Sequence, residues 1–395
     1  MKKTLKSMIC IALCFFTLVL AGCAGANAPS PSAPEDTATP ETAQTASAEP
    51  SEEPKAETRT VKDATDRDIV VPAQIDRIAI ISTMPLASVY CMVGGDPAKI
   101  VALTPESKNA AVNSFLIRVA PELESVSTAF AEGETVNVEE IMSLDPDVIF
   151  YNTNNEADCT AVEQLEKLSV PCVGFSTSNS NTIGTVSDWA TLAGDVLGTQ
   201  MQAEDIVKFG RETESMIEER VSSIPEEERR SALILANYTE NAIVAAGSTF
   251  GRYWLSETGA INVAADIEQA ISPVSLEQIY EWNPEVILLN SFSAFTAEEV
   301  AAGTAVEGQD WSGLTAVKNG ELYKMPLGMY YWFPPCSDSP LSLMWIAKHI
   351  YPEQFSDIDM DAEIKEYYSR FYGIELTDED LEKLYNPPAE SAMVY

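Results

Sequence analysis

One segment of this chain occurs twice, and the two copies lie 138 residues apart. The first copy reads ETVNVEEIMSLDPDVIFYN over residues 134–152, and the second reads SPVSLEQIYEWNPEVILLN over residues 272–290. The copies align without a gap and share identical residues in both halves of the segment. Solenoid proteins have repeats of about 20–50 residues. A single repeat at so long an offset therefore predicts two similar lobes.

Each copy predicts a short amphipathic helix, a Pro that ends it, and a buried strand rich in β-branched residues. Strands are predicted around the first copy at 77–82, 99–103, 147–151 and 171–175, and around the second at 231–237, 241–247, 285–290 and 321–325. Helical patterns separate these strands, and such alternation predicts a parallel sheet with helices on its faces. The expected fold class is α/β, with two Rossmann-like lobes joined by one long helix and a ligand cleft between the lobes.

The pattern becomes helical between the lobes, from residue 189 to residue 221. We expect Gly198 to break this region into a short helix and a longer one from Gln200, which would be a stiff connection. The predicted organisation is a signal peptide at 1–22, a lipidated Cys and disordered linker at 23–60, an N-terminal lobe at 61–185, a connecting helix region at 186–224 and a C-terminal lobe at 225–395.

The first 23 residues predict export from the cytoplasm. Lysines precede an apolar stretch over 8–20, and Leu-Ala-Gly-Cys follows at 20–23. This order is typical of a signal peptide, and its end resembles a lipobox, in which Cys23 becomes the lipidated N-terminus. The alternative is an ordinary secretory signal in which Cys23 is incidental. Residues 24–60 are mostly Ala, Pro, Ser, Thr and Glu, a composition that predicts a disordered tether. The protein is expected on the extracytoplasmic face of the cell membrane.

Composition excludes several classes of protein. The chain has 24 Lys and Arg against 61 Asp and Glu, a formal net charge of −37, so it lacks the basic surface of a nucleic-acid binder. His349 is the only histidine, so several imidazoles cannot bind a metal; we expect it to pack within a helix, with axial haem ligation as the alternative. Motifs of hydrolases and P-loop proteins are absent, and no enzyme, resident cofactor or metal is expected.

Four cysteines lie in the predicted lobes, at 91, 159, 172 and 336, without CxxC spacing. We expect them to be small buried apolar groups. A disulfide between Cys159 and Cys172 is possible in an exported protein, but sequence spacing does not decide it.

Three motifs and the long helix together resemble one known family. The motifs are NVEEIMSLDPDVIF at 137–150, GSTFGRYWLSETGAINVA at 247–264 and YYWFPPCSDSPLSLMWIAKHIYPE at 330–353. Over residues 61–395 the chain resembles solute-binding lipoproteins of ABC importers, from the group that serves iron–siderophore complexes, haem and cobalamin. The resemblance implies a rigid helical crossover, a ligand between the lobes, and delivery to an ABC permease dimer with its ATPase. We expect a monomer.

In that family a glutamate on each lobe meets arginines of the permease, and the matching positions here are Glu139 and Glu277. The repeat supports this assignment independently, because it places both residues at the same position in their copies. Arg–carboxylate pairs would give geometric register as well as attraction. The alternative is that both glutamates only favour the positive end of a helix dipole.

Ligands of open α/β sheets bind beyond the carboxyl ends of the strands. This rule places the following residues on the rim of the cleft: Ser82, Thr83, Met84, Asn152, Thr153 and Asn154 in the first lobe, and Arg252, Tyr253, Trp254, Tyr330, Tyr331 and Trp332 in the second. Arg252 and Arg118 would meet oxyanions of a ligand. Tyr331 or Tyr253 would suit haem iron. The alternative for Trp254 and Trp332 is core packing.

Aromatic faces with a few polar groups suit a bulky, partly apolar metal chelate, and a ferric siderophore is the expected ligand. Haem or cobalamin is one alternative. Molybdate or tungstate is another, although the negative chain opposes an oxyanion unless Arg252 and Arg118 converge. A scaffold lipoprotein with an empty cleft is a third. The related fold of nitrogenase-type enzymes is excluded, because the paired Cys ligands it needs are missing.

Overall fold

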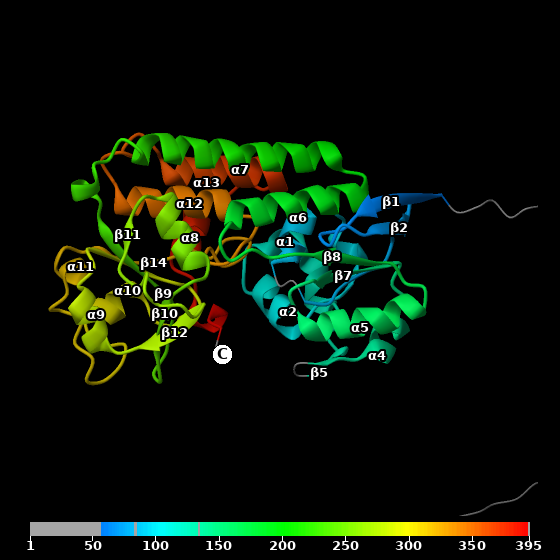
Figure 1. The fold of residues 1–395 in the computed structure, drawn as a ribbon, viewed down its shortest axis with the longest axis horizontal. Coiled ribbons are helices and arrows are strands. Elements are labelled where there is room, and N and C mark those ends of the chain that lie inside the picture. The colour runs from blue at the N-terminus through cyan, green and yellow to red at the C-terminus, as the bar shows by residue number, and fades with distance from the viewer. Residues whose placement is uncertain (1–56, 83–84, 133–134, 394–395) are drawn as a thin grey trace, which may run out of the picture. The chain divides into compact units, whose positions relative to one another are not determined.

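A computed structural model of the protein describes residues 57–82, 85–132 and 135–393 (Figure 1). The predicted signal peptide, Cys23, most of the predicted tether, Thr83 and Met84 lie outside these residues. Residues 55–395 form one compact unit. In the described part of the chain, none of the helices has both the length and the hydrophobicity needed to cross a membrane.

The N-terminal sheet has four parallel strands in the order β4-β3-β7-β8. Their bounds are β3 Ile78–Ile80, β4 Ile100–Ala102, β7 Val148–Asn152 and β8 Cys172–Phe175, which confirms four predicted strands. These strands are short apolar runs because helices cover both faces of a parallel sheet. The connecting helices are α1 Leu86–Met92, α2 Pro105–Val112, α3 Leu116–Val119, α4 Val138–Ser143 and α5 Glu156–Lys167.

The C-terminal sheet has six strands, with the path β12-β10-β9-β13-β14 and β11 beside β9. The strands are β9 Ser231–Tyr238, β10 Ile243–Ala246, β11 Ile261–Asn262, β12 Ile271–Val274, β13 Val286–Leu289 and β14 Leu322–Lys324. Strands β9, β13 and β14 run parallel, whereas β10 is antiparallel to both of its neighbours, so this sheet is mixed. Its helices are α8 Phe250–Glu257, α9 Leu276–Trp282, α10 Ala297–Ala301 and α11 Thr315–Lys318.

Long helices form a layer along one side of both sheets (Figure 1). Helix α6 covers Thr182–Leu197 and α7 covers Gln200–Val221, a helix of 22 residues. Gly198 lies between them with a φ of 78°, which confirms the predicted break. Helices α12 Ser339–Ile350 and α13 Met360–Tyr372 join the layer, and α12 packs against α6, α7 and α13. Helix α14 Asp378–Tyr385 follows.

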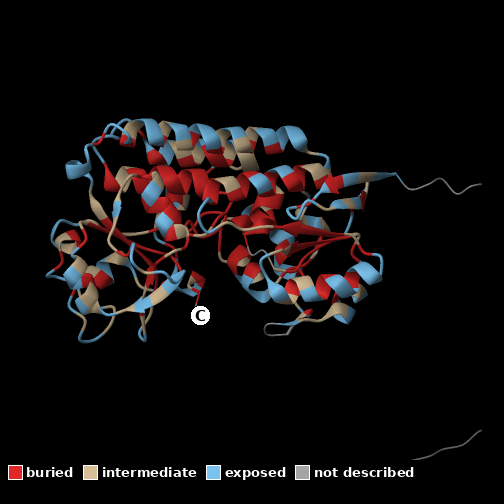
Figure 2. Ribbon diagram, in the orientation of Figure 1, coloured by how far each residue is buried: buried red, intermediate tan, exposed pale blue. Residues whose placement is uncertain are grey.

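One apolar core lies beneath this helical layer and continues through both sheets, and a smaller core lies on the opposite face of each sheet. Buried positions are concentrated in the strands and on the inner sides of α6 and α12 (Figure 2). His349 on α12 belongs to this packing, because its ring lies 3.9 Å from that of Trp345 and its Nδ1 donates to the Trp345 carbonyl. The prediction of helix packing for His349 is confirmed. Cys159 and Cys172 are both free, so the structure contains no disulfide between them.

The sequence repeat is also a structural repeat. Each copy places a short strand, a capped helix and a central strand of its sheet in the same order, as β6 (Thr135–Val136)-α4-β7 and β12-α9-β13. The residue before the shared Pro has a positive φ in both copies, 46° at Asp145 and 42° at Asn283. The two halves therefore match in backbone conformation as well as in sequence.

The described chain begins with a hairpin of β1 Thr58–Lys62 and β2 Asp68–Pro72 that the sequence did not reveal. The predicted disordered linker is therefore wrong at its end, because residues 58–60 belong to β1. Arg59 fixes this hairpin by donating from Nη1 to the carbonyl of Val196, 3.0 Å away at the end of α6, and from Nη2 to the carbonyl of Ala73.

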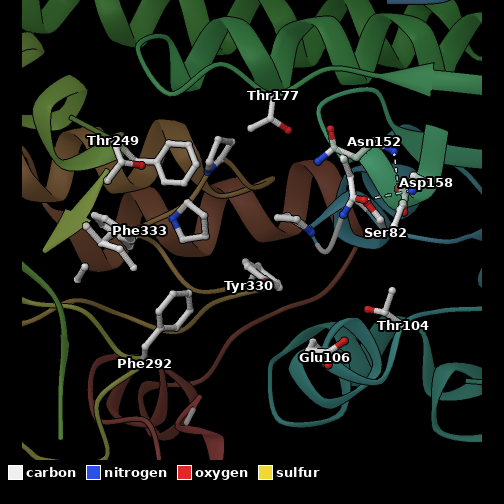
Figure 3. Close-up of a pocket in the computed structure, with 18 of the residues that line it drawn as sticks. Ser82, Thr104, Glu106, Asn152, Asp158, Thr177, Thr249, Phe292, Tyr330 and Phe333 are labelled. Atoms are coloured by element: carbon white, nitrogen blue, oxygen red, sulfur yellow. Dashed lines mark hydrogen bonds between the residues drawn. The ribbon is translucent and has the colours of Figure 1, made fainter. Parts of the chain in front are cut away.

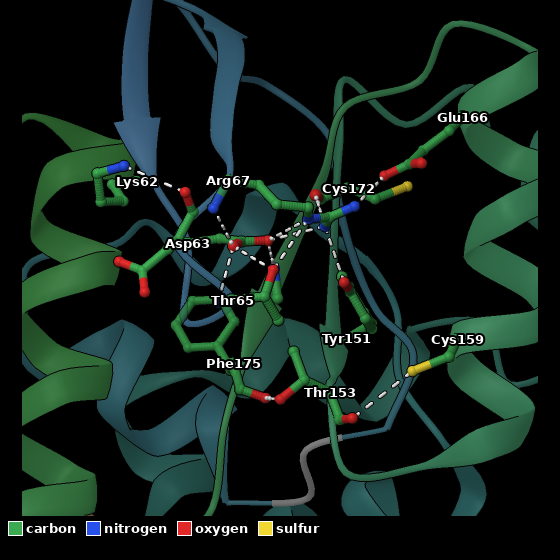
Figure 4. A network of polar contacts seen from close by, with 12 residues as sticks. Lys62, Asp63, Thr65, Arg67, Tyr151, Thr153, Cys159, Glu166, Cys172 and Phe175 are labelled. Carbon is green, nitrogen blue, oxygen red and sulfur yellow. Dashed lines mark hydrogen bonds and ion pairs between the residues drawn. The ribbon is translucent and has the colours of Figure 1, made fainter.

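A half-buried ion pair fastens the turn of the hairpin to the N-terminal sheet (Figure 4). The Asp63 carboxylate accepts from Nη2 of Arg67 at 2.7 Å, and the same guanidinium donates to the Tyr151 hydroxyl and to Glu166. Tyr151 lies on β7 and Glu166 on α5, so a single arginine joins the hairpin to two elements of the lobe.

Candidate ligand-binding site

A cavity of about 670 Å³ lies between the two sheets and is lined from both (Figure 3). Much of its polar lining comes from residues at or just after the carboxyl ends of strands: Ser82 after β3, Thr104 and Glu106 after β4, Asn152 at the end of β7, Thr177 after β8, and Asn237 near the end of β9. The strand-end rule used on the sequence therefore holds for this cavity. Its size is within the usual range for small-molecule sites.

Asp158 organises the N-terminal wall. It belongs to the first turn of α5, whose start is capped by Asn155. Its Oδ2 accepts the backbone N–H of Asn152 at 3.0 Å, and its side chain also bonds that of Ser82. Burial raises the pKa of Asp158 above its usual range, and the bonds from Ser82 and Asn152 oppose that shift. The carboxylate thus holds two cavity residues from different strands.

The C-terminal wall is largely aromatic. Phe250, Phe292, Tyr330 and Phe333 line the cavity, and Pro334 and Pro335 continue the surface. The ring of Phe333 packs edge-on against Phe250 at 5.8 Å and against Phe292 at 6.5 Å between centroids. Trp189 of α6 also lines the cavity, with its indole N–H donating to the Ser176 carbonyl at 2.7 Å.

The charged groups of the cavity are acidic. Among the described residues that line it, Glu106 and Asp158 carry carboxylates, and none is Lys, Arg or His. The described residues also contain no group of three or more His, Cys, Asp or Glu side chains that could bind a bare metal ion. The site can therefore offer apolar contact, hydroxyl and amide hydrogen bonds, and negative charge.

The structure places three residues predicted on the rim of the cleft, Ser82, Asn152 and Tyr330, in the cavity wall. Thr153 does not line the cavity, and its hydroxyl donates to the Phe175 carbonyl. Thr83 and Met84 lie outside the described residues.

Four predicted aromatic residues support the cavity wall from behind and do not line it. Trp254 is fully buried and donates from Nε1 to the Phe333 carbonyl at 2.8 Å. Trp332 donates to Asp338, Tyr331 to the Ser391 carbonyl, and Tyr253 to Glu214. The core-packing alternative therefore holds for Trp254 and Trp332. In the run of aromatic residues over 330–333, the first and last, Tyr330 and Phe333, line the cavity, and the two between them do not.

The two predicted arginines do not converge on the cavity. Arg118 forms an ion pair with Asp380 of α14 at 2.9 Å. Arg252 is exposed and donates from Nη2 to the Ala265 carbonyl at 2.9 Å. Neither arginine lines the cavity, so the predicted convergence is not observed, and contact of either one with a ligand oxyanion stays a prediction.

Several lining residues were missed, and some of them had a signal in the sequence. Thr104, Thr177 and Phe292 each follow a predicted strand by one or two residues, so the strand-end rule applied to every strand would have found them. Asp158 had no such signal, because its role depends on the fold of the turn before α5.

Glu139 and Glu277 occupy the first turns of α4 and α9 and are both exposed. Helices α4 and α9 lie one on each lobe, on the side of the sheets away from α7 (Figure 1). Hydrogen bonds at the helix start lower the pKa of Glu277, so it is ionised at neutral pH.

Two α/β lobes that enclose a cavity beneath a common helical layer define a two-lobed solute-binding protein. The chain belongs to the family described as periplasmic binding protein, whose profile matches residues 93–327. Members of this family are substrate-binding proteins of ABC transporters, so the chain is an extracytoplasmic binding protein of such a transporter and has a permease partner.

Individual relatives agree with the family. The chain is 25% identical over 335 residues to a molybdate-binding protein of Haemophilus influenzae, and the alignment covers 80% of this chain and 91% of that protein. It is 25% identical over 214 residues to an iron(3+)-hydroxamate-binding protein of Bacillus subtilis, covering 51% and 62%. A periplasmic solute-binding protein of Veillonella parvula has a similar solved structure, with a TM-score of 0.76, 29% identity, and coverage of 84% of this chain and 97% of that one.

Proposed function

We propose that this protein captures a ferric siderophore of low or positive net charge, of the hydroxamate kind, and delivers it to its permease. The observation that carries this proposal is a cavity of about 670 Å³ whose described lining is aromatic, hydroxylic and acidic without a Lys or Arg. A ferric hydroxamate presents an apolar periphery and little or no negative charge, so it suits such walls. The similarity to an iron(3+)-hydroxamate-binding protein supports the same ligand class.

Molybdate or tungstate is the second candidate. The molybdate-binding relative aligns over most of both chains. In addition, α2, α5 and α8 all begin at the cavity, with Thr104, Asn155 and Thr249 at their starts, and helix N-termini favour anions. Against it stand the acidic lining and a cavity far larger than one tetrahedral oxyanion.

Equilibrium titration of the tag-free mature protein separates the candidates. Trp189 is the tryptophan among the described lining residues, so its emission should be quenched by a coloured chelate. We expect saturable binding of ferrichrome and ferrioxamine B, monitored by fluorescence and calorimetry, and no comparable binding of ferric enterobactin, haem, cobalamin or molybdate. Binding of molybdate alone would overturn the siderophore proposal and favour the oxyanion.

We also propose that Glu139 and Glu277 dock the permease. Their equivalent positions in the two repeat copies, their exposure, and the placement of α4 and α9 support a two-point contact with a two-fold partner.

We propose that Cys23 carries a lipid that holds the protein at the membrane, as its lipobox-like context indicates. A Cys23→Ser variant should leave the membrane fraction, whereas unchanged fractionation would contradict the anchor. Mass spectrometry of the wild-type N-terminus gives the direct check.

A further inference from the structure

Asp338 is a fully buried carboxylate directly behind the aromatic wall of the cavity. It immediately precedes α12. Its Oδ2 accepts three hydrogen bonds, from the backbone N–H of Met329 at 2.6 Å, from Nε1 of Trp332 at 3.1 Å and from the hydroxyl of Tyr368 at 3.1 Å. Two of these donors belong to one turn of the chain, and the third belongs to α13.

The turn over residues 328–332 is built around this carboxylate. Gly328 leaves room for it, since a Cβ at that position would lie 2.1 Å from Oδ2 of Asp338. The turn is closed by a bond from Gly328 N–H to the Tyr330 carbonyl at 3.0 Å and by one from Trp332 N–H to the Pro326 carbonyl at 3.3 Å. Asp338 is thus the centre about which this segment folds.

The same turn joins the cavity to both lobes. Tyr330 and Phe333, at and just after it, line the cavity. From the N-terminal lobe, the backbone N–H of Phe115 donates to the Gly328 carbonyl at 2.9 Å, and the Ser114 hydroxyl donates to the Met329 carbonyl at 3.1 Å. A change at Asp338 would therefore act on the wall of the cavity where the lobes meet.

The surroundings of Asp338 leave its charge without a cationic partner. The titratable groups that face it are Cys336 from its own segment and Tyr367, Tyr368 and Tyr372 from α13, and none of these is a cation at neutral pH. Among the described residues, no Lys, Arg or His forms an ion pair with it. Burial raises the pKa of Asp338 to about 6, and the bonds from Met329, Trp332 and Tyr368 oppose this shift because they favour the ionised form. If the turn withdrew these donors while the carboxyl stayed buried, the pKa of Asp338 would rise further, so protonation favours the loosened turn.

We propose that Asp338 is a positioning residue for ligand binding: its ionised carboxylate holds the 328–332 turn and with it Tyr330 and Phe333, and protonation loosens this wall and weakens capture of the ligand. The effect on affinity rests on the proposed function of the cavity. The ordering of the turn does not, because it concerns the ligand-free protein.

The first measurement therefore needs no ligand. The NMR signal of the Trp332 indole N–H is assigned from its absence in the Trp332→Phe variant. Heteronuclear NMR then follows this signal from about pH 4.5 to about pH 8.0. We expect the signal to titrate with a midpoint near the pKa of Asp338, and to stay fixed in Asp338→Asn, which keeps an acceptor oxygen but no charge. Tyr368→Phe removes one donor to the carboxylate, so it should move the midpoint to higher pH and provides a test if Asp338→Asn does not fold. A Trp332 signal that does not titrate, or that titrates equally in Asp338→Asn, would overturn the inference.

The second measurement uses ferrioxamine B as the probe. Its affinity for the wild type should fall about fivefold or more as the pH drops from about 7.5 to about 5. Asp338→Asn should keep a weak affinity without this Asp338-dependent fall. Asp205→Asn, which removes an exposed carboxylate paired with Arg370 of α13, is the matched control and should behave as wild type. Asp158→Asn identifies any pH dependence that comes from the opposite wall.

The two measurements distinguish failure of the positioning role from failure of the proposed function. Equal pH profiles in wild type and Asp338→Asn would overturn the positioning role. If the Trp332 signal titrates as expected but no ferric hydroxamate binds at any pH, the proposed function is wrong, while the assignment of Asp338 as the group that orders the turn is supported.

Discussion

The Arg67 side chain links three parts of the N-terminal lobe. Its guanidinium reaches the buried Asp63 carboxylate, a tyrosine hydroxyl of the central strand and a glutamate of α5. Asp63 is 4% exposed, and burial alone would raise its pKa, but hydrogen bonds from Arg67 and Thr65 outweigh this and lower the pKa below its usual range. A buried charge that has such partners stabilises the fold only while it is ionised.

Asp63→Asn should destabilise the protein by about 1–3 kcal/mol at pH 7, because Arg67 loses its charged acceptor. A lowered folded-state pKa gives stability that is present above the unfolded-state pKa and is lost as the pH falls through the folded-state value. The difference between wild type and variant should therefore shrink below about pH 4. Urea unfolding at several pH values measures it.

Asp66→Asn is the matched control, because Asp66 is exposed in the same turn. It should change stability by about 0.5 kcal/mol or less. The assigned role of the ion pair would be contradicted if the difference in unfolding free energy between wild type and Asp63→Asn stayed constant down to about pH 3.

At the scale of single elements, helix α6 and helix α7 pack closely because Gly194 presents no side chain at their contact. A Cβ at Gly194 would lie 2.7 Å from the Cβ of Ala203, and neither atom can rotate away. This close approach keeps α6 and α7 packed together in the helical layer that spans both lobes.

Gly194→Ala should cost about 1–3 kcal/mol of unfolding free energy, because overpacking exceeds the gain in helix propensity. Thr191→Ala on the exposed side of the same helix introduces the same residue and should be nearly neutral. Chemical denaturation compares the two, and equal stability of both variants would show that the helices separate without cost.

Most strands of the two sheets were predictable, because they are short apolar runs between breakers. Strands β11 and β12 were not predicted, because they contain exposed positions and are not continuous buried runs. Gly198 and the Pro after each repeat helix gave clear boundaries in the sequence. The β1–β2 hairpin was missed because its strands alternate exposed and buried residues beside a disordered-type composition. The cavity was predicted only in outline, since the facing of Tyr330, Tyr331 and Trp332 depends on a turn around Asp338 that lies further along the chain.

At the scale of the whole molecule, the duplicated unit gives the two lobes exposed glutamates at equivalent positions, Glu139 and Glu277, each in the first turn of a short helix. Changing both Glu139 and Glu277 to Ala should lower ligand uptake by cells about tenfold or more while the dissociation constant of the isolated protein stays unchanged. Transport assays and titration measure the two quantities.

The double variant Glu140→Ala, Glu281→Ala removes neighbouring exposed carboxylates from the same two helices and serves as control. Normal uptake by the Glu139, Glu277 double variant would rule out the proposed docking, and equal loss in the control would point to net charge instead.

The net charge of −37 also predicts how ligands approach. The association rate constant of ferrioxamine B, a cation, should fall as salt rises from about 0.01 M to about 0.5 M, because screening removes the attraction. Neutral ferrichrome should show little change. Stopped-flow fluorescence provides both rates, and an identical salt dependence for the two chelates would contradict electrostatic steering.

Arg59 has a mechanical consequence. Any tension on the chain before residue 57 enters the folded protein through the first residue of β1, at the open end of the hairpin, where strands would unzip one pair at a time. The Arg59 guanidinium stabilises that end by donating hydrogen bonds to the carbonyls of Ala73 and Val196. A pull on the hairpin is thereby passed to the end of α6 and to the helical layer, in addition to the first strand pair.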